Sequence, residues 1–364
     1  MSAPAHEDPV RELLVGAVSD GWMPGAAWWV EARQQVVSRG AVGWAALEPR
    51  RIAAHESLPY DLASLTKPLA TALLLVLLEQ AGRVDPLRPV HCFLPQLRGS
   101  VFSEASLLDL ATHTAGLAAW RPVYLDAADR EAYLERIARE PRAVQQGRVL
   151  YSDLGYILLG AALERLEDVS LEQQFHQRIA APLGLPRIGF ASDPRRFADA
   201  AATERGNAYE REMARDDRGR HRWRTAILQG EVHDANANAL GGIAGHAGLF
   251  GTVAEVASIA RELLRPSRLE LGPRARARML EPASGAPGRT VGCVTASAAA
   301  AARGILPAAA PGHTGFTGTS LWLDPVHDRF FVLLCNRVHP AVPQRDFRVI
   351  RRGFHRLGAR LTRV

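Results

Sequence analysis

The chain of 364 residues carries 44 basic and 38 acidic side chains, for a formal net charge of +6, and is 47% hydrophobic and 23% charged. These values suit one large globular domain or two modest ones and exclude wholesale disorder. The basic residues are scattered, and the one dense run, at 215–224, also holds two aspartates and is typical of a solvated loop, so we expect no nucleic-acid partner.

The first residues lack a basic start followed by an apolar stretch, so no signal peptide is predicted. The longest apolar run, 68–78, is too short to span a bilayer. We therefore expect no membrane span and a cytoplasmic location, or a periplasmic one if a signal has been removed. The three cysteines, Cys92, Cys293 and Cys335, have no C-x-x-C spacing and indicate neither a disulfide framework nor a zinc pattern.

The N-terminal part of the chain predicts a helix followed by two strands. Residues 7–20 have the period of an amphipathic helix. Residues 25–45 hold two β-rich runs separated by Ser38-Arg39-Gly40, which is typical of a hairpin with its turn at those three residues.

A long helix is expected to follow, from Ser64 or Leu65 to Gly82. Pro68 limits its start, because proline is tolerated only in the first turn of a helix, and glycine is a common residue just beyond a helix end. The segment is apolar almost all round, so the helix should lie in the middle of the protein.

The rest of the chain predicts helices and loops first and strands last. Loops are expected over 191–248. Further helices are expected over 104–112, 129–140, 153–166, 171–181 and 253–264. A second hairpin, with strands at 319–323 and 329–336, precedes a terminal helix at 345–361. This order predicts an α+β fold, an α/β sandwich in which one antiparallel sheet built from both termini is flanked by helices and a mostly helical region is inserted.

One residue stands apart in the composition: 43 of the 44 basic residues are arginine, and Lys67 is the only lysine. Arginine keeps its proton at any working pH, whereas lysine can lose its proton when it is removed from water. A removable proton at position 67 would explain the exception. Codon bias with one accidental lysine is the alternative.

Ser64 lies three residues before Lys67, so the two side chains share one face of the predicted helix. The serine is at the positive end of the helix dipole, which favours developing negative charge. Burial of the lysine one turn deeper would lower its pKa and make it a base for the serine hydroxyl. We interpret this pair as a nucleophile and its activating base.

Two other short motifs could complete such a site. Tyr151-Ser152-Asp153 precedes a predicted helix, where Tyr151 could share the proton transfer and Asp153 could bind the lysine; a helix cap with a packed tyrosine is the alternative. His313-Thr314-Gly315 precedes a predicted strand, where the N–H groups of Phe316 and Ser64 could form an oxyanion hole; a glycine-rich turn is the alternative.

Together these motifs resemble the serine β-lactamase and penicillin-binding-protein superfamily, in particular its class C-like branch of D-alanyl-D-alanine carboxypeptidases and esterases. The family signature is S-x-x-K, then Y-x-N, then K-T-G or H-T-G, and the three motifs here have its order and wide spacing; the likeness covers roughly residues 10 to 355. Other similar stretches are 107–117, 151–164, 182–185, 241–252 and 312–325.

The resemblance implies one β-lactamase-like catalytic domain over 1–364. Its sheet part would be about 8–65 plus 285–364 and its helical part about 66–284. It implies Ser64 as the acylated nucleophile, Lys67 and Tyr151 as the proton-transfer pair, and a small-molecule substrate, with no cofactor or metal.

The same resemblance places the remaining site residues. Ser64 and Phe316 would supply the oxyanion N–H groups, and His313, Thr314 and Gly315 would line the third side of the site. Two motifs depart from the family pattern: Asp153 stands where asparagine is usual and would hold Lys67 charged, and His313 in place of lysine predicts weak β-lactamase activity.

Four residues outside these motifs are further candidates. His233, Asp234 and His246 could hold a metal, but we favour a wall of the substrate cleft, with His246 binding substrate; a purely structural role is the alternative to that wall. Arg337 could bind a substrate carboxylate or pair with an acidic neighbour. The function predicted from all of these residues is a serine hydrolase acting on a D-amino-acid peptide, a β-lactam or a small ester, and the alternative is a non-catalytic scaffold or ligand sensor.

Overall fold

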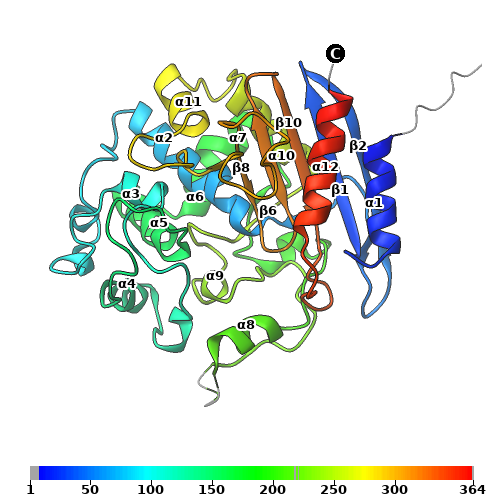
Figure 1. Cartoon of the computed structure of the whole chain (residues 1–364). Helices are drawn as coiled ribbons and strands as arrows, with labels where there is room; N and C mark the ends of the chain where they lie inside the picture. The colour runs from blue at the N-terminus through cyan, green and yellow to red at the C-terminus, as the bar shows by residue number, and fades with distance from the viewer. Residues whose placement is uncertain (1–7, 217–218, 220, 363–364) are drawn as a thin grey trace, which may run out of the picture.

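A computed structural model describes residues 8–216, 219 and 221–362, so part of the arginine-rich run at 215–224 lies outside the described residues. Its main feature is a seven-stranded antiparallel sheet in the order β3-β2-β1-β10-β9-β8-β7 (Figure 1). The strands are β1 (Gly25–Ala32), β2 (Gln35–Ala46), β3 (Ile52–Ala53), β7 (Val294–Thr295), β8 (Pro311–Thr314), β9 (Ser320–Asp324) and β10 (Arg329–Cys335). Because β1 pairs with β10, both ends of the chain build the centre of the sheet, as predicted.

Helices cover both faces of this sheet (Figure 1). Alternate side chains of a strand point to opposite faces: Trp28 packs with α1 (Pro9–Ser19) and α12 (Arg348–Leu361), whereas Trp29 belongs to the larger core on the side of α10 (Val253–Leu264). The α+β fold class predicted from the sequence is therefore confirmed. Among the described residues, every helix is too short or too polar to cross a membrane.

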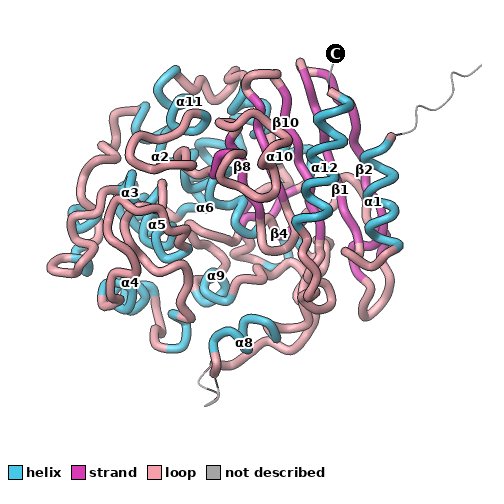
Figure 2. The backbone as a smooth tube through the Cα atoms, viewed as in Figure 1, coloured by secondary structure: helices cyan, strands magenta, loops and turns pink. Residues whose placement is uncertain are grey.

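The inserted region is mainly helical, with long connecting loops (Figure 2). Its helices are α2 (Leu73–Gln80), α3 (Leu107–Ala111), α4 (Arg130–Ala138), α5 (Asp153–Glu167), α6 (Leu171–Phe175), α7 (Ala181–Leu183), α8 (Ala208–Ala214), α9 (Ala235–Ala239), α10 and α11 (Pro273–Leu280). A small sheet of β4 (Tyr60–Asp61), β6 (Leu249–Gly251) and β5 (Gly189–Phe190) joins this region to the segment before Ser64. The segment 191–248 is mostly loop, as predicted, but it also contains the short helices α8 and α9.

The turn of the first hairpin lies elsewhere than predicted. It falls at Arg33 and Gln34, both at positive φ (50° and 66°), and β2 runs on through Ser38 and Gly40. The prediction of a turn at 38–40 is wrong because Gly40 serves side-chain packing: a Cβ there would lie 2.6 Å from Cη2 of Trp28. The indole Nε1 of Trp28 also donates to Ser38 Oγ at 2.7 Å.

The helix that carries the candidate nucleophile begins and ends where the sequence indicates. It starts with a 3₁₀ turn (Ala63–Leu65), continues as a π-helical turn (Lys67–Ala72) and becomes α2, which is followed by Gly82 at a φ of 67°. The π-helical turn was not predicted. It contains Pro68, which has no N–H for a regular α-helical ladder.

A buried ion pair ties the C-terminal hairpin to α12. Arg329 Nε lies 2.8 Å from Asp324 Oδ2, and Arg329 Nη1 donates to Ala359 O at 3.0 Å. Replacing Arg329 with leucine should lower the free energy of unfolding by about 3 kcal/mol, because Asp324 would stay buried without its main partner. His327 Nδ1, 2.8 Å from the same oxygen, would offset only part of this loss.

Urea unfolding followed by circular dichroism measures this effect. Arg195, on the surface beside Asp193, provides the matched control, and its change to leucine should leave the free energy of unfolding nearly unchanged, because solvent screens an exposed ion pair. Equal losses of unfolding free energy in the two variants would show that the buried Asp324–Arg329 pair stabilises the fold no more than the surface pair does.

Candidate active site

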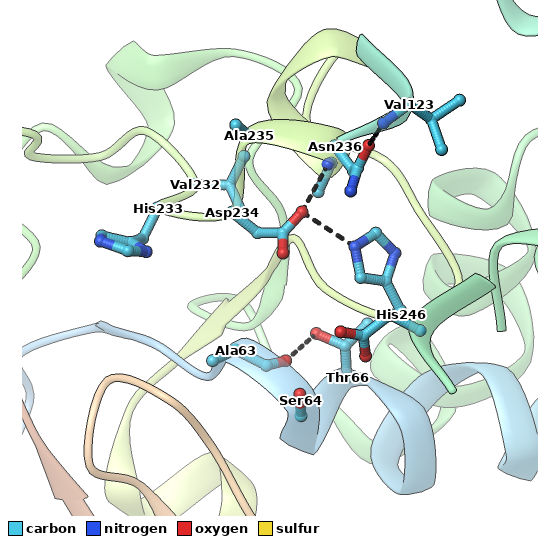
Figure 3. Close-up of polar contacts among 12 residues, drawn as sticks. Ala63, Ser64, Thr66, Val123, Val232, His233, Asp234, Ala235, Asn236 and His246 are labelled. Carbon is cyan, nitrogen blue, oxygen red and sulfur yellow. Dashed lines mark hydrogen bonds and ion pairs between the residues drawn. The ribbon is translucent and has the colours of Figure 1, made fainter. Parts of the chain in front are cut away.

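Ser64 lies at a tightly constrained junction between β4 and the central helix. The preceding residue, Ala63, has a φ of 48°, a left-handed conformation that is costly for a residue with a Cβ. Asp61 Oδ1 accepts from Ala63 N at 2.8 Å. Thr66 Oγ1 donates to Ala63 O at 2.7 Å, as Figure 3 shows. Thr66 Oγ1 in turn accepts from Leu249 N of β6, so this junction is held from both sides.

The Ser64 hydroxyl contacts both predicted proton-transfer residues. Lys67 Nζ lies 3.1 Å and Tyr151 OH 2.9 Å from Ser64 Oγ. Tyr151 comes from the loop before α5, and His113 supports it: the rings lie 4.7 Å apart, and His113 Nδ1 accepts from Ser152 N at 3.0 Å. The sequence motifs 87 residues apart therefore meet at one oxygen atom.

Lys67 is fully buried but has two polar partners besides Ser64. Its Nζ lies 2.7 Å from Asp153 Oδ1 and donates to the carbonyl of His246 at 3.1 Å. Burial lowers the pKa of Lys67, and the Asp153 charge opposes that shift without cancelling it. A lysine with a lowered pKa is suited to accept the serine proton.

The pKa of Tyr151 is shifted in the opposite direction to that of Lys67. Burial, followed by the charge of Asp153, raises the pKa of the Tyr151 phenol well above its usual value. A phenol with a raised pKa keeps its proton at neutral pH, so Tyr151 is suited to pass on a proton and Lys67 to accept one.

Asp234 and His246 point toward each other and form a second polar pair in the same region as Ser64 (Figure 3). Asp234 Oδ1 is 2.9 Å from His246 Nε2 and accepts from Ala237 N at 2.8 Å. Burial raises the pKa of Asp234, but the charge and hydrogen bond of His246, the hydrogen bond from Ala237 N and the charge of Lys67 together lower that pKa. The His246 side chain is only 1% exposed, so it lies beneath the cleft and reaches Lys67 through its backbone carbonyl.

His233 points away from this pair. Its Nε2 lies 2.9 Å from Glu204 Oε2, and its ring packs 5.4 Å from the ring of Phe316. Among the residues that the structure describes, no three His, Cys, Asp or Glu side chains gather closely enough to hold a metal ion.

The third predicted motif lies on β8, beside Ser64. His313 Nδ1 lies 2.9 Å from Thr314 O, and burial, followed by the charges of Lys67 and Arg289, lowers the pKa of His313 well below its usual value. A Cβ on Gly315 would lie 2.1 Å from Thr319 Oγ1 and 2.8 Å from the carbonyl of Leu62. Glycine therefore allows this strand end to approach the segment that carries Ser64.

Two cavities meet at Ser64, and Asp153 and Phe316 also line both. The larger, of about 540 Å³, extends along the third motif and past Tyr151. We call it the arginine lobe because four arginines line it: Arg289, Arg337, Arg348 and Arg351. The smaller, of about 200 Å³, lies toward α8, and we call it the acidic lobe. Its acidic lining residues are Asp61, Asp153, Glu210 and Asp234.

Arg337, a candidate for carboxylate binding, lines the arginine lobe, and its Nε donates to Phe316 O at 2.9 Å. The sequence did not single out Arg289, whose guanidinium carbon lies 5.8 Å from the centre of the Tyr151 ring. Nor did it single out His113 or Asp61. None of the three stands in a motif that marks it, and only His113 falls within one of the family-like stretches, 107–117.

The pairing of Asp153 with Lys67 leads to a prediction about pH. In Asp153→Asn the charge that raises the Lys67 pKa is gone, so that pKa should fall further. Since the rate would rise with pH as Lys67 loses its proton, the rising limb of the kcat/KM profile should move to lower pH. The control Asp168→Asn makes the same change at the exposed far end of α5 and should leave the limb in place. A limb that stays put in Asp153→Asn, or moves to higher pH, would contradict this role.

Comparison with known proteins gives matches over most of the chain. The model of the family described as Beta-lactamase matches residues 10–353. The chain is 28% identical to an N-acetylmuramyl-L-alanine amidase of Bacillus subtilis, over 92% of the chain and 81% of that protein. It is 31% identical to a putative D-alanyl-D-alanine carboxypeptidase of Escherichia coli K12, over 79% of the chain and 71% of that protein.

Solved structures show the same fold at lower sequence identity. EstCE1, a hydrolase with promiscuous acyltransferase activity, superposes with a TM-score of 0.74 at 19% identity, over 96% of this chain and 97% of that one. A penicillin-binding protein homologue from Pyrococcus abyssi gives a TM-score of 0.68 at 20% identity, over 90% of this chain and 72% of that one.

Proposed function

The chain belongs to the Beta-lactamase family, and on that basis we propose that it is a serine hydrolase that works through an acyl-enzyme. One observation carries the proposal: Ser64 Oγ lies within hydrogen-bond distance of both Lys67 Nζ (3.1 Å) and Tyr151 OH (2.9 Å). A hydroxyl between an amine of lowered pKa and a phenol of raised pKa has a base and a proton donor in place.

In the first step Lys67 accepts the proton of Ser64 as Oγ attacks an ester or amide carbonyl carbon. The N–H groups of Ser64 and Phe316 stabilise the negative charge that forms on the carbonyl oxygen. Tyr151 donates its proton to the leaving amine or alcohol and regains one from Lys67. In the second step the proton transfers run in reverse. Water attacks the carbonyl carbon of the acyl-enzyme, and Ser64 Oγ regains its proton as it leaves.

Several features support a peptide or ester with a carboxylate on the leaving group. The arginine lobe would bind that carboxylate, and Arg337 lies on its wall. Relatives are named as a carboxypeptidase and an amidase, and a fold neighbour is a hydrolase with acyltransferase activity. With burial keeping His313 neutral, this position gives a carboxylate less charge than lysine would, so β-lactams are expected to be poor substrates.

Intact-mass spectrometry after acid quenching tests the proposal with three substrate classes: 4-nitrophenyl esters, D-alanyl-D-alanine peptides and penicillins. We expect a covalent acyl adduct with at least one class, together with steady release of product. If no class gives an adduct and none is hydrolysed, the chain is instead a non-catalytic scaffold or ligand sensor of the same fold.

A further inference from the structure

The segment that contains the C-terminal helix α12 carries most of the excess positive charge of the chain. Residues 345–362 hold six arginines and one aspartate, a net charge of +5, where the whole chain has a net charge of +6. The six are Arg345, Arg348, Arg351, Arg352, Arg356 and Arg360. Charge gathered on one short segment gives that part of the surface a positive potential that the net charge alone would not produce.

Four of these arginines form one row along α12. They follow one another at intervals of four residues, so each side chain lies beside the next on the surface of the helix. We call this row the basic stripe, and it consists of Arg348, Arg352, Arg356 and Arg360. Arg352 is partly buried and the other three are exposed. The stripe therefore faces solvent along most of the helix.

The apolar side of α12 is already used by the fold. Ile350 and Phe354 are buried in the core that α12 shares with α1. A Cβ on Gly353 would lie 3.0 Å from Leu13 Cδ2, so the two helices touch, and Figure 1 shows them side by side on the same face of the sheet. A partner of the outer side of α12 would therefore be bound by charge, without insertion of the helix.

The basic stripe has few of the acidic partners that exposed arginines have elsewhere on the chain. On α4, for example, Arg139 pairs with Glu135 one turn away at 3.0 Å. Among the described residues, the only ion pair of the stripe is that of Arg348 with Asp346, at 2.8 Å. Three guanidinium groups of the stripe therefore keep a charge that no carboxylate of the described fold neutralises.

The residues around the stripe favour a lipid surface over a nucleic acid. Val349 stands next to Arg348 and is 57% exposed. An anionic membrane surface attracts clustered arginines and accepts an aliphatic side chain at its headgroup boundary. Contacts to nucleic acids also use Ser, Thr, Asn, Gln, Lys or Tyr side chains, and none of these occurs over 348–361.

We propose that the basic stripe of α12 is a docking face for an anionic phospholipid surface, to which the folded protein binds peripherally. The contact is electrostatic and reversible, and it needs no spanning helix, of which the described part of the chain has none. Arg348 also lines the arginine lobe, so docking would bring that lobe close to the lipid headgroups. This inference does not depend on the proposed function.

Sedimentation of the full chain with lipid vesicles tests the docking face. The protein should bind vesicles of equal parts phosphatidylcholine and phosphatidylglycerol but not vesicles of phosphatidylcholine alone, and added salt should release it. In the double variant Arg356→Gln/Arg360→Gln, the lipid concentration for half-maximal binding should rise about thirtyfold, from about 1 kcal/mol for each arginine near an anionic surface. Ester hydrolysis without vesicles should be unchanged, because neither residue lines a lobe.

The double variant Arg98→Gln/Arg148→Gln is the matched control. It removes the same charge from exposed residues of the inserted region and should bind mixed vesicles as the wild type does. Absence of binding to mixed vesicles would overturn the proposal. An equal loss in the two double variants would also overturn it, because net charge and not the stripe would then be responsible. Tighter binding to a short DNA duplex than to mixed vesicles would assign the stripe to nucleic acid instead.

Discussion

Replacement of Ser64 by alanine is expected to lower kcat by about 10⁶-fold and to abolish labelling by fluorophosphonates, as loss of an activated serine nucleophile does in other hydrolases. The alanine variant keeps the Cβ and the backbone N–H at position 64, so the junction held by Asp61 and Thr66 should persist. Initial rates with a 4-nitrophenyl ester, measured over hours, give the size of the loss.

Ser57→Ala provides the matched control, since Ser57 is exposed and bonds only to His55 nearby among the described residues. It should keep wild-type turnover and labelling. Turnover that survives in Ser64→Ala with wild-type KM would mean that another group performs the reaction and that the Ser64–Lys67–Tyr151 cluster has a structural purpose.

Replacement of Lys67 by arginine is expected to lower kcat/KM by about 10²–10⁴-fold, the usual contribution of a general base. Arginine keeps a positive charge beside Asp153 but cannot give up its proton at working pH. Lys67→Met, which keeps similar volume and has no charge, should lose a similar factor. Thermal unfolding identifies any variant that fails because it does not fold.

The two variants together separate the roles of Lys67. If it acts as a base, both lose activity, because neither side chain can accept the Ser64 proton. If arginine supported near-wild-type turnover while methionine did not, Lys67 would act through its charge alone, and the base would have to be Tyr151.

The sequence anticipated the parts of this molecule that depend on short patterns. The Ser64–Lys67 pair follows from helical spacing, and the sheet built from both termini follows from where the β-rich runs lie. The turn of the first hairpin was wrongly predicted at 38–40, because a glycine next to a polar pair usually marks a turn. In the structure Gly40 instead makes room for the Trp28 ring.

The surroundings of Lys67 could not be predicted in the same way. The His246 carbonyl lies 179 residues from Lys67, and Glu210 meets Ala235 across a loop. Such contacts depend on how distant segments pack, and isolated histidines and acids carry no spacing that indicates their partners. The opposite charge of the two lobes is likewise visible only once the cavities are formed.

The presence of a single lysine among 44 basic residues has a physical explanation if Lys67 is the base. Full burial favours its neutral form and Asp153 favours its charged form, so the balance between them sets the pH at which Ser64 becomes reactive. Arginine at this position would satisfy Asp153 equally well but would leave Ser64 without a base.

The most direct test of the central claim is to locate the acyl group on the chain. Wild-type protein is treated with a 4-nitrophenyl ester or a fluorophosphonate, quenched in acid, digested and sequenced by tandem mass spectrometry. The account predicts one modification per chain, on Ser64, and none in Ser64→Ala. A modification on any other residue, or steady hydrolysis with Ser64 never modified, would contradict it.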